Sequence, residues 1–183
     1  MILALDVSTS VIGICLLDQN ATAGQRRLQS LEFLNLKREK NLFSKAIDFR
    51  DHILKYKSLG VKTVAIEEPL VMYKPGNSRA QILSKLSMFN GMISVICYMV
   101  FGIEPIYYNV NHARKLAFPE LKFKKGEERK MVVWARVAEV FPEVQWLYGP
   151  RSGNLVKTNF DMADSAVVAL AHEAAIREQE LIK

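Results

Sequence analysis

The stretch from Met1 to Gly13 reads MILALDVSTSVIG, in which Asp6 and several small residues separate two apolar runs. Its apolar residues 2–5 are typical of a strand that is buried on both faces. Asp6 stands where that run ends, and a second apolar run at 11–17 predicts the next strand. Asp6 alone leaves two interpretations open. It either caps the turn by accepting backbone hydrogen bonds or belongs to a metal or phosphate site, since an unpaired buried charge is costly.

The remaining sequence predicts three strands in series, followed by alternating helices and strands. The expected strands are residues 2–5, 11–17, 28–36, 61–66 and 103–110, and the expected helices are residues 39–58, 80–101, 112–116, 127–141 and 160–181. Gly60 is expected to end the first helix, and Asn111 is expected to cap the third. This order predicts an α/β fold with a mixed five-stranded sheet. An antiparallel three-strand meander is joined to parallel strands, and helices flank the sheet.

Composition limits the class of protein. The 183 residues suit a single domain over 1–183, and the hydrophobic share of 50% excludes a disordered chain. The net charge of +6 permits nucleic-acid binding without proving it. Cys15 and Cys97 lie in apolar runs and are interpreted as buried thiols in a reducing compartment. No basic region precedes the first apolar run, so we expect no signal peptide and a cytoplasmic location in a bacterial or phage-infected cell.

The stretch from Leu86 to Ile103 carries no charged residue, and its length reaches the lower limit for a membrane-spanning helix. It contains the polar residues Ser87, Asn90 and Ser94. We therefore favour a buried central helix over a membrane span, and we expect no membrane partner.

Four carboxylates stand at related places in the expected elements. Asp6 and Glu67 each follow an apolar strand, while Asp161 and Asp164 are three residues apart and share one face of the last helix. If the strands at 2–5 and 61–66 are parallel neighbours, their C-terminal ends meet at the crevice where such sheets usually bind ligands.

Carboxylates that are gathered in this way repel one another unless a cation neutralises them. Mg²⁺ takes carboxylate oxygens and keeps waters for a substrate phosphate. Two such ions can hold the attacking and leaving oxygens of a phosphodiester displacement. The pattern thus indicates metal-dependent phosphodiester chemistry. A plainer interpretation stays open, because acids in a first helical turn complement the helix dipole and Glu67-Glu68 suits a solvated strand end. Asp164 fits a solvated role less well, as its neighbours are apolar.

In order and spacing, four segments resemble the RuvC-type Holliday-junction resolvases of the RNase H-like superfamily, in a form closer to divergent phage or viral members. They are Ile2 to Thr9 with Gly13, Val64 to Glu68, Lys125 to Val137, and Asp161 to Ala166. Together they cover nearly the whole chain, and Asp-x-x-Asp-Ser-Ala opening an alanine-rich helix is the most specific. Val7-Ser8 stands where many members have Pro-Gly.

The resemblance implies an RNase H-like fold and a structure-selective DNA endonuclease. Such an enzyme resolves four-way and other branched junctions as a homodimer, with two Mg²⁺ or Mn²⁺ ions per active site and no nucleotide cofactor, and leaves 5′-phosphates. The catalytic and metal-binding residues it implies are Asp6, Glu67, Asp161 and Asp164. Glu67 is the match because it directly follows Ile66, and an assisting role of Glu68 stays open.

A metal site on DNA needs cationic surroundings to hold the phosphate backbone. The basic residues that adjoin the acid-bearing elements are Lys74, Arg79, Lys122, Lys124, Lys125, Arg129, Lys130, Arg151 and Lys157, and we interpret them as DNA-binding rather than as a solvated face. Leu70 and Tyr73 stand nearest the position of the junction wedge in the family.

Two other functions remain as alternatives. An ATPase of the actin type would need a second lobe and a second glycine-rich loop, which the sequence lacks. A catalytically idle or RNA-processing RNase H-like nucleic-acid-binding protein would show no stabilisation by divalent metal.

Overall fold

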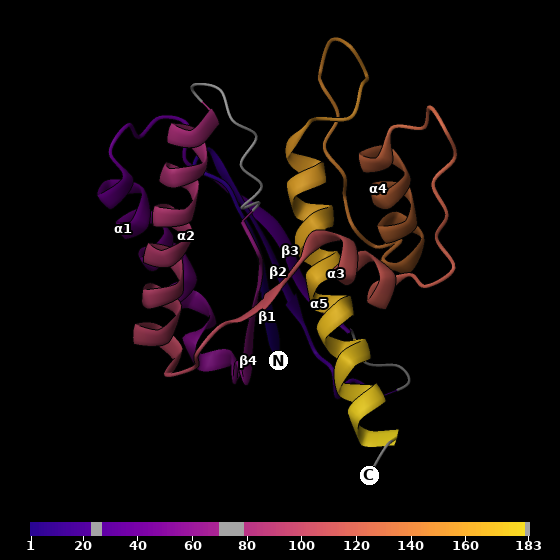
Figure 1. Cartoon of the computed structure of the whole chain (residues 1–183), viewed down its shortest axis with the longest axis horizontal. Coiled ribbons are helices and arrows are strands. Elements are labelled where there is room, and N and C mark those ends of the chain that lie inside the picture. Colours follow the sequence, from indigo (N-terminus) through magenta and orange to yellow (C-terminus); the bar gives the residue numbers. More distant parts are fainter. Residues whose placement is uncertain (23–26, 70–78, 182–183) are drawn as a thin grey trace.

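The sheet of this protein has five strands in the order β3-β2-β1-β4-β5. The computed structural model describes residues 1–22, 27–69 and 79–181, apart from the side chain of Arg79. The strands are β1 (Ile2–Val7), β2 (Val11–Leu17), β3 (Leu28–Asn35), β4 (Thr63–Glu67) and β5 (Ile106–Tyr108). The first three form an antiparallel meander, whereas β4 is parallel to β1 and β5 is parallel to β4. The predicted mixed sheet is therefore confirmed (Figure 1).

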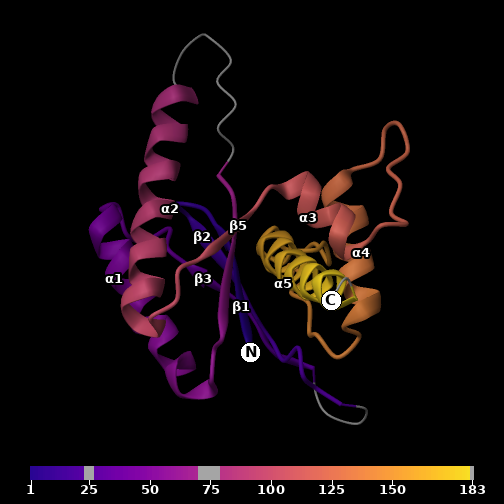
Figure 2. The ribbon, with the colours of Figure 1, turned by 60° about the horizontal axis from the view of Figure 1, so that its bottom comes forward.

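Helices cover both faces of this sheet. One face carries α1 (Leu42–Ile53), the 3₁₀ helix η1 (Leu54–Leu59) and α2 (Arg79–Phe101), and the other carries α3 (Val110–Ala117), α4 (Arg129–Val140) and α5 (Thr158–Leu181). Figure 2 shows the two layers on opposite sides of the strands. Because side chains alternate along a strand, Leu3 and Leu5 pack toward α1 and α2, whereas Ile2 and Ala4 pack toward α5. This double burial explains the unbroken apolar run that opens the chain.

Helix α5 lies directly against β1 and β2, and its side chains are buried along most of the first two thirds of its length. At Gly13 the approach is closest, because a Cβ atom built there would lie 1.9 Å from the carbonyl oxygen of Asp161. Gly13 is also the partner of Asp6 in the β1–β2 register. The absence of a side chain at residue 13 therefore lets the first turn of α5 lie beside Asp6.

Several element boundaries differ from the sequence expectation. The helix expected at 39–58 is divided into α1 and η1, and Gly60 follows with a φ of 70°, as its end-cap role predicts. The expected strand 103–110 is reduced to the three residues of β5. Asn109, not Asn111, caps α3, because Asn109 has the extended backbone of a cap and its side chain accepts a hydrogen bond from the Asn111 amide.

The expectation that α2 is a buried central helix is wrong. Phe89, Ile93 and Cys97 pack on the sheet, but no further layer covers the other side of α2 among the described residues. The exposed apolar side chains on α2 are Ile82, Met88, Val95, Tyr98 and Met99. By length and composition alone, residues 80–101 would also suit a membrane span. The free thiols of Cys15 and Cys97 are buried, as predicted, and burial raises the pKa of each to about 12.

Candidate active site

The four predicted acids line one cavity of about 430 Å³. It lies where the C-terminal ends of the parallel strands β1 and β4 meet the first turns of α5. The acidic residues on its wall are Asp6, Glu67, Glu68, Asp161 and Asp164, and the basic ones are Arg114 and Lys130. The sequence-based prediction of the crevice between the two strands therefore coincides with an observed cavity.

Strand alternation directs two of these acids toward α5. Asp6 follows Ala4 at a spacing of two in β1, and Glu67 follows Ala65 in the same way in β4, while both alanines pack on the α5 side of the sheet. Glu68 comes one residue after the strand end, and its amide donates to the carbonyl oxygen of Tyr108. The pleat thus supports Glu67 as the acid that faces α5, and Glu68 lies at the rim of the same cavity.

The other two acids come from α5 itself. Asp161 lies in its first turn and is half-buried, and Asp164 follows one turn later with 7% of its surface exposed. Their spacing of three residues places both on the helix face toward the cavity. The burial of Asp164 agrees with its apolar sequence neighbours and argues against a purely solvated role.

Asp6, Glu67 and Asp161 have raised pKa values. Burial raises the pKa of Asp6 well above its usual range, and the charges of Glu67, Asp164 and Asp161 raise it further. Burial and then Asp164 raise the pKa of Glu67 to about 7. The pKa of Asp161 is also raised, chiefly by burial, although Lys130 lowers it. The cations of the protein therefore do not neutralise this cluster fully.

Arg114 on α3 pairs with one of the acids. Its Nη2 lies 3.1 Å from Oδ1 of Asp164, and the two side chains are only 13% and 9% exposed. Sequence reasoning missed this residue, because the run His112-Ala113-Arg114-Lys115 looks like any solvated helical turn. The contact depends on how α3 packs against α5, which no local pattern reveals.

The chemistry of the acids suits a hard divalent cation, because all their ligand atoms are carboxylate oxygens. In the described parts of the chain, however, no three His, Cys, Asp or Glu side chains are grouped closely enough to hold one ion. Asp164 is instead paired with Arg114. The oxygen ligands of the four residues thus fit Mg²⁺ or Mn²⁺ by chemistry.

A second, basic cavity of about 420 Å³ adjoins the acidic one. Lys37, Lys130 and Lys157 line it, and it shares Ser8, Lys130 and Asp161 with the acidic cavity. Lys130 and Lys157 were predicted from the sequence, but Lys37 was missed, because the run Lys37-Arg38-Glu39-Lys40 follows the expected strand at 28–36 and adjoins none of the acid-bearing elements in sequence. Both Lys37 and Lys130 lower the pKa of Asp161, so they lie near the acids.

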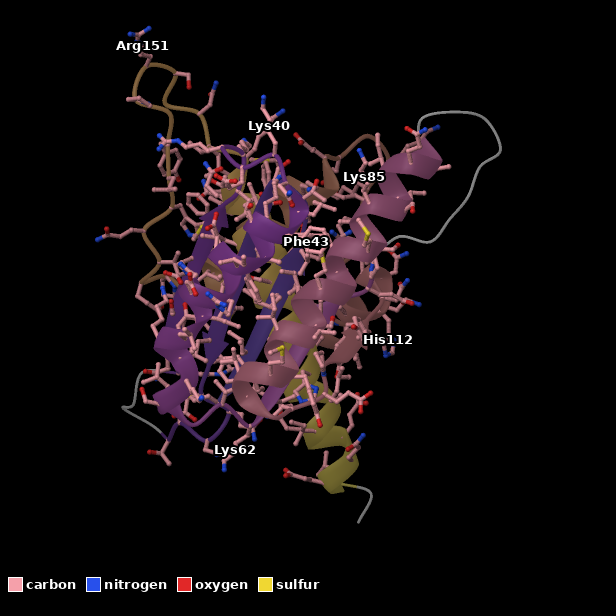
Figure 3. The ribbon with its side chains drawn as sticks, turned by 90° about the vertical axis from the view of Figure 1, so that its left-hand side faces the viewer. Lys40, Phe43, Lys62, Lys85, His112 and Arg151 are labelled. Atoms are coloured by element: carbon pink, nitrogen blue, oxygen red, sulfur yellow. The ribbon has the colours of Figure 1, made fainter. Side chains whose placement is uncertain are left out.

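The other predicted DNA-binding residues lie outside both cavities. Lys122, Lys124 and Lys125 are exposed between α3 and α4, and the guanidinium of Arg129 lies 5.4 Å from the centre of the Phe123 ring. Arg151 is at the tip of the loop before α5 (Figure 3). Leu70, Tyr73, Lys74 and the side chain of Arg79 lie outside the described residues, so their proposed contacts remain predictions.

No protein-family model and no curated protein sequence matches this chain. Solved structures do match it. RuvC of Thermus thermophilus in complex with a Holliday junction substrate is 15% identical, with a TM-score of 0.68 over 97% of this chain and 95% of that one. The yeast mitochondrial Holliday junction resolvase is 14% identical, with a TM-score of 0.59 over 94% and 77%. The fowlpox virus resolvase in complex with Holliday junction DNA is 15% identical, with a TM-score of 0.52 over 96% and 97%.

These matches extend over nearly the whole chain, so the likeness includes the sheet and both helical layers. The RNase H-like fold expected from the resemblance to RuvC-type resolvases is confirmed.

Proposed function

We propose that this protein is a metal-dependent endonuclease that cuts branched DNA, with four-way junctions as its principal substrate. The observation that carries the proposal is the meeting of Asp6, Glu67, Asp161 and Asp164 around one cavity. The fold supports it, because the solved structures that share the fold are Holliday-junction resolvases, and two of them hold junction DNA.

The proposed mechanism assigns a separate role to each group of side chains. Two Mg²⁺ or Mn²⁺ ions, when bound, would supply an activated water and stabilise the leaving oxygen of a phosphodiester, leaving a 5′-phosphate. Asp6 and Glu67 lie at the C-terminal ends of the adjacent parallel strands β1 and β4 and would hold the ions from the sheet side of the cavity. Asp161 and Asp164 complete the acid set from α5. Lys130 lines both cavities and would bind the phosphate of the bond that is cut.

The basic cavity supports binding of the DNA backbone beside the acids. Lys37, Lys130 and Lys157 line this cavity together with Asp161. A strand whose scissile phosphate lies at the acids would place a neighbouring phosphate near these lysines. Such contacts position the backbone without reading its sequence.

We further propose that the protein acts as a homodimer, because a four-way junction offers two opposed strands for cutting. The surface formed by α1 and α2 supports this arrangement. A groove of about 540 Å³ between the two helices is lined mainly by apolar side chains, among them Phe43, Ile47, Val95 and Met99. Exposed apolar patches of this kind mark association surfaces, and α2 has no charged residue after Lys85, so pairing of two copies through it would bury none there.

The decisive experiment compares a synthetic four-way junction, a fork and a linear duplex in Mg²⁺, cut by wild type and by Asp6→Asn. We expect wild type to cut the junction preferentially and Asp6→Asn to cut at least about 100-fold more slowly, since it loses a carboxylate shared by the proposed ions. Equal rates for the two proteins would show that the site is wrong.

One observation favours a second candidate, a catalytically idle or RNA-processing nucleic-acid-binding protein. Asp164 is paired with Arg114, and the described residues contain no ready-made metal-ligand cluster. Thermal unfolding with and without Mg²⁺ or Mn²⁺ separates the two candidates. A nuclease with an intact site gains stability from the metal by mass action. A melting temperature that neither metal changes would support the catalytically idle or RNA-processing protein.

A further inference from the structure

Arg114 brings a positive charge into the cavity that the four acids line. It extends from α3 into the cavity that the four acids line, and its Nη2 bonds Oδ1 of Asp164 at 3.1 Å. With 13% exposure it is shielded from water. A cation of the protein is therefore held in the acid site by one of the expected metal ligands.

The bonding of the Arg114 guanidinium is incomplete. A guanidinium offers five N–H donors, yet the bond to Asp164 is the one hydrogen bond that this side chain makes within the described residues. Its Nε is fully buried and has no hydrogen-bond partner there. Buried polar atoms normally have hydrogen-bond partners. The charge of the acids therefore holds this guanidinium more than a complete set of hydrogen-bond acceptors does.

Arg114 also acts on a second acid from another element. After burial and the repulsion from Asp164, its charge is the strongest influence on the pKa of Glu67, and it lowers that pKa more than Lys130 does. One guanidinium thus attracts a carboxylate at the end of β4 and another on α5. An ion bound between these two elements would interact with the same pair.

We propose that Arg114 is a built-in counter-cation of the acids, which competes with the divalent ion for Asp164 and must release Asp164 before the ion binds. This inference rests on the proposed function, because it takes Asp164 to be a metal ligand. Arg114 then sets how much free metal the protein needs, and the site binds metal more weakly than its four carboxylates alone would.

A different role for Arg114 gives the opposite result. If Arg114 only orients Asp164 for the ion, its removal weakens metal binding. If Arg114 competes with the ion, its removal strengthens metal binding. The direction of the change in Mn²⁺ affinity therefore distinguishes the two roles without any measurement of DNA cleavage.

The experiment measures Mn²⁺ binding to DNA-free protein by calorimetry and by electron paramagnetic resonance, for wild type, Arg114→Gln, Arg114→Lys and Arg136→Gln. Arg136 is the matched control, because it carries the same charge but pairs with Glu120 and Glu139 away from the acids. We expect Arg114→Gln to bind Mn²⁺ about tenfold more tightly, the scale on which a neighbouring charge alters a carboxylate, and Arg136→Gln to stay within about twofold, as for a screened exposed pair.

Thermal unfolding provides a second readout. Without metal, Arg114→Gln should melt below wild type, because the acids then repel one another without their counter-cation. Addition of Mg²⁺ should raise the melting temperature of Arg114→Gln by more than it raises that of wild type. If Arg114→Gln fails to fold, Arg114→Lys tests the inference in its place, because the point charge of lysine cannot form the two-pronged contact of a guanidinium. We expect Arg114→Lys to bind Mn²⁺ about threefold more tightly than wild type.

Unchanged or weaker Mn²⁺ binding by folded Arg114→Gln, or by Arg114→Lys in its place, overturns the inference and leaves the proposed function intact. Failure of the proposed function looks different, because wild type would then bind no Mn²⁺ at all. Both results are read from wild type and variant in the same titration.

Discussion

Asp6 and Asp164 line the same cavity but have opposite surroundings. Burial and three neighbouring acids raise the pKa of Asp6, whereas Asp164 is paired with Arg114 at 3.1 Å. Neutralising Asp6 removes repulsion, whereas neutralising Asp164 removes repulsion and also leaves Arg114 buried without its ion-pair partner. The two residues should therefore respond oppositely to the same chemical change in metal-free protein.

We expect Asp6→Asn to stabilise the metal-free protein by about 1 kcal/mol, because the charge on Asp6 is disfavoured there. Asp164→Asn should destabilise it by about 2 kcal/mol, because Arg114 is left without its partner. Urea unfolding in a chelator measures both changes. Repeating the unfolding with Mg²⁺ should show that both variants lose the stabilisation by metal. A fall in stability for metal-free Asp6→Asn would contradict the repulsion inferred for this cavity.

Glu32 on β3 predicts how stability responds to acid. Burial acts to raise its pKa, but hydrogen bonds with His52, Lys55 and Tyr56 outweigh burial and lower the pKa from 4.5 to about 2. A carboxylate with a lowered pKa stabilises the fold above the unfolded value and loses that contribution as the pH falls from 4.5 toward 2. We expect a loss on the order of 2 kcal/mol across this window.

Glu32→Gln tests this expectation, because it cannot titrate. The variant should start less stable at neutral pH and lose less stability on acidification than wild type, as followed by chemical unfolding at a series of pH values. Asp51→Asn is a suitable control, since Asp51 is exposed and pairs only with its neighbour Arg50 among the described residues. Parallel pH profiles for wild type and Glu32→Gln would exclude the predicted role.

At the residue scale, the sequence predicts the acids much better than their partners. Asp6 and Glu67 can be predicted because each ends an apolar run, and the ends of parallel neighbouring strands converge. Asp161 and Asp164 follow from helical spacing. Arg114 and Lys37 could not be predicted, because their roles depend on which elements pack together, and side chains far apart in sequence carry no local signal of that contact.

At the scale of elements, the basic cavity joins the end of β3, the start of α4 and the approach to α5. Lys37, Lys130 and Lys157 come from these three places. Lys40 follows Lys37 closely in sequence and is exposed, but it lines neither cavity (Figure 3). The two lysines therefore form a matched pair in which the charge is the same and the placement differs.

We expect Lys37→Gln to weaken junction binding and to reduce the slope of log affinity against log salt by about 1, as for the loss of one phosphate contact. Lys40→Gln should leave the slope unchanged. Fluorescence anisotropy without divalent metal, at several salt concentrations, measures both variants. The same slope for Lys37→Gln and Lys40→Gln would show that the DNA does not contact the basic cavity.

Element boundaries show what local patterns can and cannot predict. The sequence predicts helices with clear periodicity, such as α4, to within a few residues, and Gly60 ends η1 as its sequence position predicts. Strand β5 is shorter than its apolar run, because backbone pairing with β4 extends over only three residues. The exposed side of α2 could not be predicted, since the same apolar residues suit a core helix and an association surface.

The whole molecule has one helical layer with a largely buried long helix, α5, and one with a long helix, α2, that remains exposed on one side. This difference supports the proposed dimer, with α1 and α2 toward the partner copy. Val95 is 59% exposed and Met99 is 75% exposed, and both line the groove between the two helices. A stable interface of standard size buries about 800 Å² on each partner, which a helix as long as α2 can offer.

We expect Val95→Glu to convert the dimer to a monomer, because it would place two unpaired charges in an apolar interface. Gln81→Glu is the control, since Gln81 is exposed on α2 but does not line the groove. Analytical ultracentrifugation measures the mass of both variants. A monomeric wild type would contradict the proposed dimer, and a dimeric Val95→Glu would place the interface elsewhere.

The direction of α5 has a practical consequence for work with the protein. Asp161 and Asp164 lie near its beginning, and the helix continues for about 26 Å beyond Asp164. Met1 likewise lies at the end of β1 opposite to Asp6. Met1 and the end of α5 at Leu181 therefore both lie on the side of the molecule away from the acids (Figure 1). An affinity tag or a surface tether at either end should leave the cavity open, so that immobilised molecules can be observed while they meet DNA supplied in solution.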